Sequence, residues 1–166
     1  KENKKQNGDS YNIYTDGLKI YTTIDTRLQK YAEEAATQHL SRYQGIFNAQ
    51  FAGGWKPWET DAGKKILETA CKYTDRWAAL KEQGLSSEDI LKNFKTDKHR
   101  MKVFTYKGQK DTTLSPYDSV KYYKSFLQVG FMAVEPYTGY VRAWVGGPNF
   151  EYFKYDHCNV NTKRQV

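Results

Sequence analysis

Hydrophobic residues recur at three- and four-residue steps over much of the chain, which predicts amphipathic helices. The first such stretch follows Asp25, whose carboxylate can accept hydrogen bonds from the free amides of a first helical turn. We therefore expect a helix of about five turns that buries one apolar face. The residues of this face are Leu28, Tyr31, Ala32, Ala35, Ala36, Leu40 and Tyr43.

A second apolar stripe predicts one continuous helix that begins at Thr60 or Asp61 and ends at Gly84. Glycine favours such an end because it enters the left-handed conformation without steric cost. Its apolar face would consist of Ile66, Leu67, Ala70, Thr74, Trp77 and Ala78. Between the first two helices, residues 45–58 break any period and predict an aromatic loop.

Two shorter helices are marked by their first residues. Ser86 and Asp89 have the spacing of a loose capping box, which predicts a helix that ends at Phe94. Ser115 followed by Pro116 combines a capping hydroxyl with a first-turn proline, a strong helix start. The buried stripe of this last helix would be Val120, Tyr123, Phe126 and Leu127.

Strand signals come from β-branched and aromatic residues that alternate with polar ones. They lie at 19–24, at 101–106 and in a hairpin formed by 131–134 and 140–145, whose turn is 135–139. Helices come mostly first and strands later, which favours an α+β fold over alternating α/β. The expected fold is a helical linker and insert followed by an antiparallel β-hairpin.

Composition limits the classes of partner. The formal net charge is +7, but the basic residues are spread from Lys4 to Arg164 without a block of five or six like charges. This spread argues against a dedicated nucleic-acid arm. Aromatic residues make up 16% of the chain, which argues against disorder, although the first ten residues read as a mobile lead-in. No run of 18 apolar residues occurs, so no membrane span is expected within this sequence.

The sequence contains no catalytic constellation that we can identify. Serine nucleophiles are typically found in GxSxG or SxxK motifs, and neither occurs; Ser86, Ser87 and Ser115 are better explained as helix caps. Glycine-rich phosphate loops are absent as well. The histidines are His39, His99 and His157. None has a partner at ligand spacing, so we assign no catalytic, cofactor-binding or metal-binding residue.

Two features leave alternatives open. Trp55 and Trp58 flank Pro57 in the predicted aromatic loop, where they could contact a glycan or a partner, or fix the loop to the core. Cys71 and Cys158 could form a disulfide or remain free thiols, and their spacing does not decide between these.

Three stretches of the chain resemble the bifunctional, class A penicillin-binding proteins. Residues 16–36 contain GLKIYTTID followed by LQKYA, similar to the segment that joins the glycosyltransferase and transpeptidase domains of that family. Residues 128–147 contain AVEPYTGYVRAWVGG, which resembles the first hairpin of the transpeptidase sheet. Residues 150–166 resemble the approach to the catalytic helix, where the family has RQxGSxFKP.

The resemblance implies a division into four segments. Residues 1–15 would be a flexible lead-in and 16–44 an interdomain linker strand and helix. Residues 45–127 carry no family motif that we recognise and would be an insert specific to one branch of the family. Residues 128–166 would be the first transpeptidase hairpin and the approach to the catalytic helix.

By the family pattern the nucleophilic serine would follow Val166, so the chain is expected to be an inactive scaffold or interaction region of a peptidoglycan synthase. The alternative is a non-enzymatic glycan- or protein-binding module. The resemblance implies peptidoglycan and accessory cell-wall proteins as partners, without nucleic acid, and a parent protein in the periplasm that is anchored outside this chain. A hairpin cut from a larger sheet has an unpaired edge, so it would pack on the insert's helices or pair with a second copy.

Overall fold

The computed structural model describes residues 4–54 and 56–162. Helices and strands together give an α+β fold, as predicted. In chain order they are α1 (Thr26–Ala52), η1 (Pro57–Glu59), α2 (Asp61–Lys72), α3 (Asp75–Glu82), α4 (Ser87–Thr96), β1 (His99–Thr105), β2 (Gly108–Leu114), α5 (Pro116–Lys124), β3 (Phe131–Val134), β4 (Val141–Val145) and η2 (Val160–Thr162). Strands β1 and β2 form one antiparallel sheet, and β3 and β4 form another.

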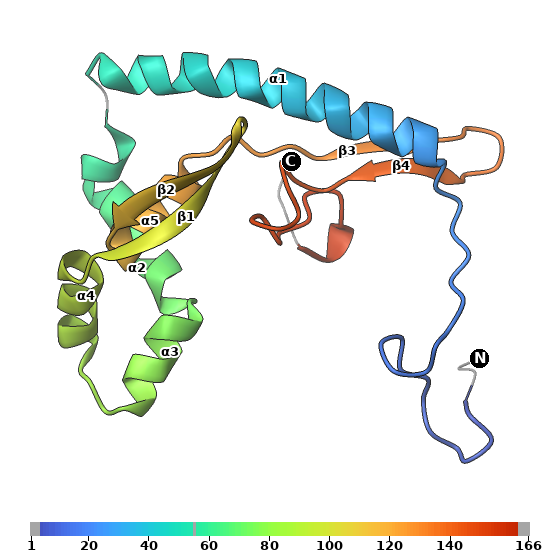
Figure 1. Ribbon diagram of the computed structural model, residues 1–166, viewed down its shortest axis with the longest axis horizontal. Helices are drawn as coiled ribbons and strands as arrows, with labels where there is room; N and C mark the ends of the chain where they lie inside the picture. Colours follow the sequence, from blue (N-terminus) through green and yellow to red (C-terminus); the bar gives the residue numbers. More distant parts are fainter. Residues whose placement is uncertain (1–3, 55, 163–166) are drawn as a thin grey trace.

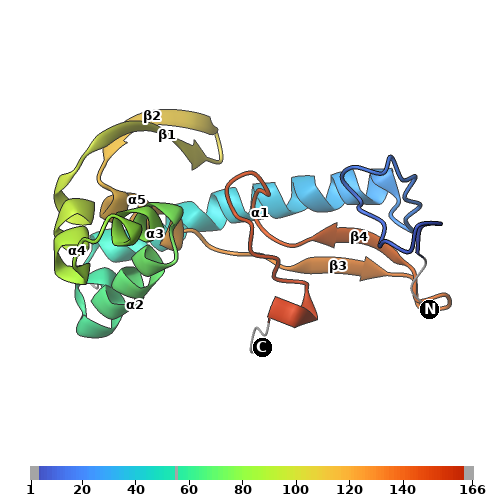
Figure 2. The ribbon, with the colours of Figure 1, turned by 90° about the horizontal axis from the view of Figure 1, so that it is seen from below.

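Helix α1 runs along the whole molecule (Figure 1). The hairpin β3–β4 lies beside its N-terminal half, while α2 to α5 and the β1–β2 hairpin gather near its C-terminal end. The view from below shows the same separation (Figure 2). The 27 residues of α1 correspond to a length of about 40 Å. Helix α1 therefore reaches from the β3–β4 hairpin to the group formed by α2 to α5 and the β1–β2 hairpin.

Helix α1 begins where predicted and continues further than predicted. The Asp25 carboxylate accepts hydrogen bonds from the amides of Arg27 and Leu28, and these bonds lower the pKa of Asp25. The predicted loop was wrong in its first part, because the helix continues through Gly45 to Ala52. A single exposed glycine costs a helix only about 1 kcal/mol, and Phe47 continues the side of the helix that packs on the protein.

The predicted buried face of α1 is largely wrong. Leu40 is buried as predicted, but Leu28, Tyr31 and Tyr43 are 44%, 61% and 44% exposed, and the other buried residue of the helix is Gln44, which was not predicted. The packed face is therefore rotated around the helix from the predicted one, because hydrogen bonds from glutamine side chains fix its orientation.

The second predicted helix is divided into α2 and α3. Thr74, expected on a buried helical face, is instead the N-cap of α3, and its hydroxyl accepts from the amide of Trp77. The same hydroxyl donates to the carbonyl of Cys71 at the end of α2. Ile66, expected to be buried, is 54% exposed. A threonine that satisfies both helix ends makes a turn more favourable than a continuous helix.

The core of this end of the molecule lies between α2, α3 and α4. Cys71, Trp77, Ile90 and Phe94 form the buried cluster. The Trp77 and Phe94 rings meet edge to face at 5.4 Å, which is a favoured aromatic geometry. Ser86 and Ser115 cap α4 and α5 through the amides of the residues three positions later, as predicted.

Strand β2 was not predicted. Its sequence is GQKDTTL, which lacks the apolar alternation of a half-buried strand. It forms because β1 supplies the full ladder, from His99 opposite Leu114 to Thr105 opposite Gly108. Gly108 has a φ of 111°, which permits the tight connection to β1.

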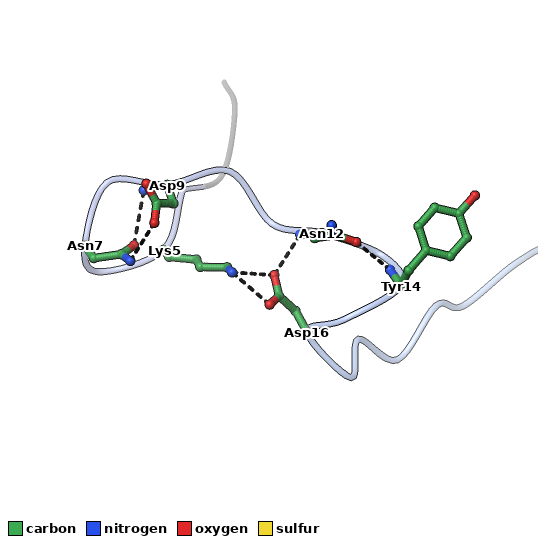
Figure 3. A network of polar contacts seen from close by, with 6 residues as sticks. All are labelled: Lys5, Asn7, Asp9, Asn12, Tyr14 and Asp16. Carbon is green, nitrogen blue, oxygen red and sulfur yellow. Dashed lines mark hydrogen bonds and ion pairs between the residues drawn. The ribbon is translucent and has the colours of Figure 1, made fainter.

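The predicted strand at 19–24 is wrong: residues 17–25, all described, form no strand. Ile20 and Tyr21 are 68% and 90% exposed, and a strand needs a partner strand for its backbone groups. Ahead of this stretch, Lys5 pairs with Asp16 at 2.7 Å, and the amide of Asn12 donates to the same carboxylate (Figure 3). These bonds lower the pKa of Asp16 and close residues 5–16 into a loop, whose mobility stays a prediction.

Candidate positioning site at the helix–hairpin junction

The predicted hairpin is present, and one of its edges is covered by the start of α1. Phe131 lies opposite Val145 and Ala133 opposite Ala143 in the β3–β4 ladder. Neighbouring residues of a strand direct their backbone groups to opposite sides. Arg142 and Trp144 therefore present their backbone groups away from β3, toward α1.

Gln29 occupies this outer edge of β4. Its side-chain oxygen accepts from the amide of Trp144 at 2.7 Å, and its side-chain nitrogen donates to the carbonyl of Trp144 at 2.9 Å. The amide of Asp25 donates to the carbonyl of Arg142 at 2.9 Å, and the Thr23 hydroxyl donates to the carbonyl of Val141 at 2.7 Å. Thr23, Asp25 and Gln29 thus satisfy backbone groups along the outer edge of β4 without forming a strand.

Gln44 makes an equivalent pair of bonds toward the other end of α1. Its oxygen accepts from the amide of Leu127 at 2.8 Å, and its nitrogen donates to the carbonyl of Ser125 at 2.9 Å. Gln44 is 7% exposed, so these bonds are largely shielded from water. The chain from Ser125 to Trp144 is therefore fixed to α1 at both of its ends.

The segment 146–158 returns to the end of β4 and is held there by Asp156. One carboxylate oxygen accepts from the indole nitrogen of Trp144 and the other from the amide of Cys158, both at 2.9 Å. A Cβ at Gly146 would lie 2.3 Å from the Asp156 carboxylate, so this contact requires glycine. The amide of His157 also donates to the carbonyl of Gly146 at 2.8 Å.

A cavity of about 630 Å³ lies between α1 and this returning segment. Glu33, Ala36 and Thr37 of α1 form one wall, and residues 144–151 and 153–156 form the others. Its lining mixes carboxylates, Lys154 and aromatic rings, without a nucleophile beside a base. The cavity is consistent with a structural space between packed elements.

Charges at the junction are paired locally. Arg142 bonds the Glu135 carboxylate at 2.8 Å and the carbonyl of Thr23 at 3.2 Å. Hydrogen bonds from the Thr138 hydroxyl and from Arg142 lower the pKa of Glu135. Arg142 therefore links the hairpin turn to the residues that precede α1.

The thiols are separate in this structure. Cys71 and Cys158 are both free, which favours the second of the two alternatives left by the sequence. Burial raises the pKa of Cys71 to about 11, and burial followed by the charge of Asp156 raises that of Cys158. Both thiols are therefore protonated and weakly nucleophilic at neutral pH.

Of the two candidate contact residues in the aromatic loop, the structure describes Trp58. Trp55 lies outside the described residues. Trp58 is half-buried in η1, and its indole nitrogen donates to the hydroxyl of Ser125 at 2.9 Å. Its polar edge is used internally, next to the Gln44 bonds, and contact of either tryptophan with a glycan or partner stays a prediction.

The histidines lie apart. His39 stacks near Tyr43 on the exposed side of α1, His99 bonds Asp97 at 2.9 Å, and His157 lies 3.3 Å from Gln128. In residues 4–54 and 56–162, no three His, Cys, Asp or Glu side chains are grouped to hold a metal ion. The same residues contain no helix that is long and apolar enough to cross a membrane.

The residues that build the junction were not singled out by their sequence pattern. Gln29, Gln44 and Asp156 are common polar residues that carry no motif. Gln44 does offer one signal, since it continues the packed stripe of α1 from Leu40 by one helical turn. A polar residue at such a position is expected to have hydrogen-bond partners.

Comparison with known proteins gives two matches, one to part of the chain and one to most of it. The family model described as "Penicillin-binding protein middle domain" matches residues 54–127. Penicillin-binding protein 1A of Aquifex aeolicus (strain VF5) is 24% identical over 164 residues, which cover 92% of this chain. The chain is thus similar to penicillin-binding protein 1A, and its residues 54–127 match the middle-domain family.

The penicillin-binding protein match places family sequence where we recognised no motif. The matched residues 54–127 lie almost wholly within the expected insert at 45–127; its boundaries and its restriction to one branch stay a prediction. The chain spans 21% of the length of the Aquifex relative. No solved structure matches the chain significantly.

Proposed function

We propose that this chain is a positioning frame within a peptidoglycan synthase, without catalytic residues of its own. In this role, α1 fixes the β3–β4 hairpin and the segment 146–158 relative to the middle-domain region. By the resemblance, the hairpin begins the transpeptidase sheet, and 150–166 approaches the catalytic helix. The parent protein would act on the periplasmic face of the inner membrane.

The observation that carries this proposal is the pair of hydrogen bonds between Gln29 and the backbone of Trp144. A side chain that satisfies both backbone groups of one strand residue fixes that strand in position and in register. Asp156 then connects the Trp144 indole to the returning segment. The position of a catalytic helix that follows would depend on this series of contacts, and small displacements of reacting groups reduce rates strongly.

The remaining edge of the hairpin supports a further contact with protein. Phe131, Met132 and Val134 of β3 are 46%, 46% and 45% exposed. The hairpin packs on α1, which differs from the first of the two expected arrangements, packing on the insert's helices; pairing between copies stays a prediction. An edge strand with exposed apolar residues favours pairing with another strand, either from the rest of the sheet or from a second copy.

A labelled-penicillin experiment tests the non-catalytic part of the proposal. The chain is incubated with a fluorescent penicillin, denatured and examined by gel fluorescence and intact mass. We expect no covalent adduct, because the thiols are protonated and no serine lies in an SxxK motif. A stoichiometric adduct that excess unlabelled penicillin prevents would contradict the proposal.

A further inference from the structure

The outer face of α2 carries an exposed apolar stripe that no described element covers. Ala62, Ile66, Thr69 and Tyr73 line a shallow cavity of about 530 Å³ together with Lys65, Ala70 and Lys124. These helix positions follow three- and four-residue steps, so they share one face. Ile66 is 54% exposed and Tyr73 is 85% exposed, so most of their apolar surface is available to a partner.

This cavity continues into a second, more aromatic one. The second cavity has a volume of about 730 Å³ and shares Ala70 and Lys124 with the first. Its other lining residues come from α2, α5 and the segment after them: Thr74, Ser119, Val120, Tyr123, Phe126, Gln128, Tyr152, Phe153, Lys154, Tyr155 and His157. The two cavities together are called here the α2–α5 groove.

The aromatic part of the groove is held open by rings that pack on one another. Tyr123 and Tyr152 are stacked with centroids 6.2 Å apart, and Phe153 meets Tyr123 edge to face at 5.8 Å. A preformed aromatic wall binds apolar groups without a large ordering cost. A cavity of this size, with aromatic walls and polar groups among its lining, is typical of a binding site.

The charges of the groove have one sign. Lys65, Lys124 and Lys154 line it, and no Asp or Glu is among its described lining residues. Within the described part of the chain, Lys65 and Lys124 form no ion pair, while Lys154 lies 4.1 Å from the centroid of the Phe150 ring. Cations around an apolar cleft attract an acidic partner and orient it.

We propose that the α2–α5 groove is a docking site for an acidic peptide segment of a partner protein. An aromatic or aliphatic side chain of the segment would enter the cavity beside Tyr123, while its carboxylates would pair with Lys65 and Lys124. A linear peptide fits better than a compact small molecule because the two cavities adjoin at Ala70 and Lys124 and can both be occupied by one chain. One wall of the groove belongs to the segment 146–158 that Asp156 holds, but Lys65, Tyr73 and Lys124 take no part in the Gln29 and Asp156 contacts, so the two roles can be tested separately.

The probe for this proposal is a fluorescein-labelled peptide in which pairs of glutamates alternate with phenylalanine. Its binding to the whole chain is measured by fluorescence anisotropy at several salt concentrations. We expect saturable binding that weakens with salt, because exposed ion pairs are screened. Peptides with Lys in place of Glu, or with Ala in place of Phe, should bind at least about tenfold more weakly, a change of ~1.4 kcal/mol.

Charge reversals locate the site. In Lys65→Glu/Lys124→Glu, the dissociation constant for the probe should rise by about tenfold or more, since two attractions become repulsions. The matched control Lys107→Glu/Lys110→Glu changes the net charge equally on the β1–β2 hairpin and should alter the constant by less than about twofold. Tyr73→Ala truncates an exposed side chain, so it should weaken binding without loss of the folded circular dichroism spectrum.

Three outcomes would overturn the proposal. The first is no binding by the glutamate–phenylalanine probe at low salt. The second is an equal loss of binding in the control reversal, which would show attraction by net charge alone. The third is binding of soluble glycan strands in a Lys65- and Lys124-dependent manner by a chain that does not bind the peptide, which would make the groove a glycan site.

Discussion

Gln29 of α1 hydrogen-bonds both the amide and the carbonyl of Trp144 in β4. A glutamine side chain carries the same donor and acceptor as a peptide unit, so it can replace one residue of a neighbouring strand. It therefore closes the edge of β4 together with Thr23 and Asp25. Among the described residues no strand pairs with the outer edge of β3, so the sheet can be extended on that side.

Gln29→Leu should destabilise the chain by about 1–2 kcal/mol, because two backbone groups of Trp144 lose their partner. Urea unfolding followed by circular dichroism gives the change. Gln38→Leu is the matched control, since Gln38 is exposed on the same helix and its replacement should change stability by less than about 0.5 kcal/mol. Equal effects of the two variants would show that the Gln29 bonds are not needed.

Gln44→Leu should lower the free energy of unfolding by about 1–3 kcal/mol. The amide of Leu127 and the carbonyl of Ser125 would lose their bonds to a side chain that is 7% exposed. Hydrogen exchange of the Leu127 amide should accelerate along with the loss of stability. Unchanged exchange at that amide would contradict the contact.

Two glycine-to-alanine changes should act in opposite directions. Gly45→Ala adds a methyl group in open space within α1 and should stabilise the chain by about 0.5–1 kcal/mol. Gly146→Ala places a Cβ against Asp156 and should destabilise by about 1–3 kcal/mol through overpacking. Thermal unfolding of both variants measures the difference, and a neutral Gly146→Ala would show that 146–158 is loosely held.

Stability should fall as the pH rises above 9. The Cys71 pKa is about 11 in the folded chain against 9.0 in the unfolded chain. The unfolded state therefore loses its proton first, and the stabilisation present below pH 9 declines by ~1 kcal/mol at pH 10. Urea unfolding between pH 8 and 10 should show this slope, and Cys71→Ala should reduce it; an identical slope in the variant would contradict the burial of the thiol.

The sequence predicted the capped helix starts and the hairpin well, because each depends on local chemistry. Asp25, Ser86 and Ser115 satisfy amides within their own first turns, and Gly139, with a φ of 72°, lies in the β3–β4 turn. The prediction of a strand at 19–24 was wrong for the opposite reason. A strand depends on a partner strand elsewhere in the chain, which the local sequence does not specify. Strand β2 was missed because its partner, rather than its own residues, determines it.

The candidate site could not be predicted from local pattern. Gln29 meets Trp144 and Gln44 meets Leu127 across more than 80 positions of sequence, and no motif marks such a contact. The resemblance to penicillin-binding proteins located the hairpin correctly but gave no account of how it is held. The predicted apolar face of α1 was also only partly correct, because Tyr31 and Tyr43 are exposed while Gln44 is buried beside Leu40.

Hydrogen exchange of the Trp144 amide most directly tests whether α1 positions the hairpin. The rate is measured by NMR in the unmodified chain, in Gln29→Leu and in the control Gln38→Leu. We expect slow exchange in the first and third proteins and an acceleration of about tenfold or more in Gln29→Leu, since a loss of ~1.4 kcal/mol of local protection corresponds to that factor. Exchange that is equally slow in all three proteins would show that α1 does not hold β4 in place.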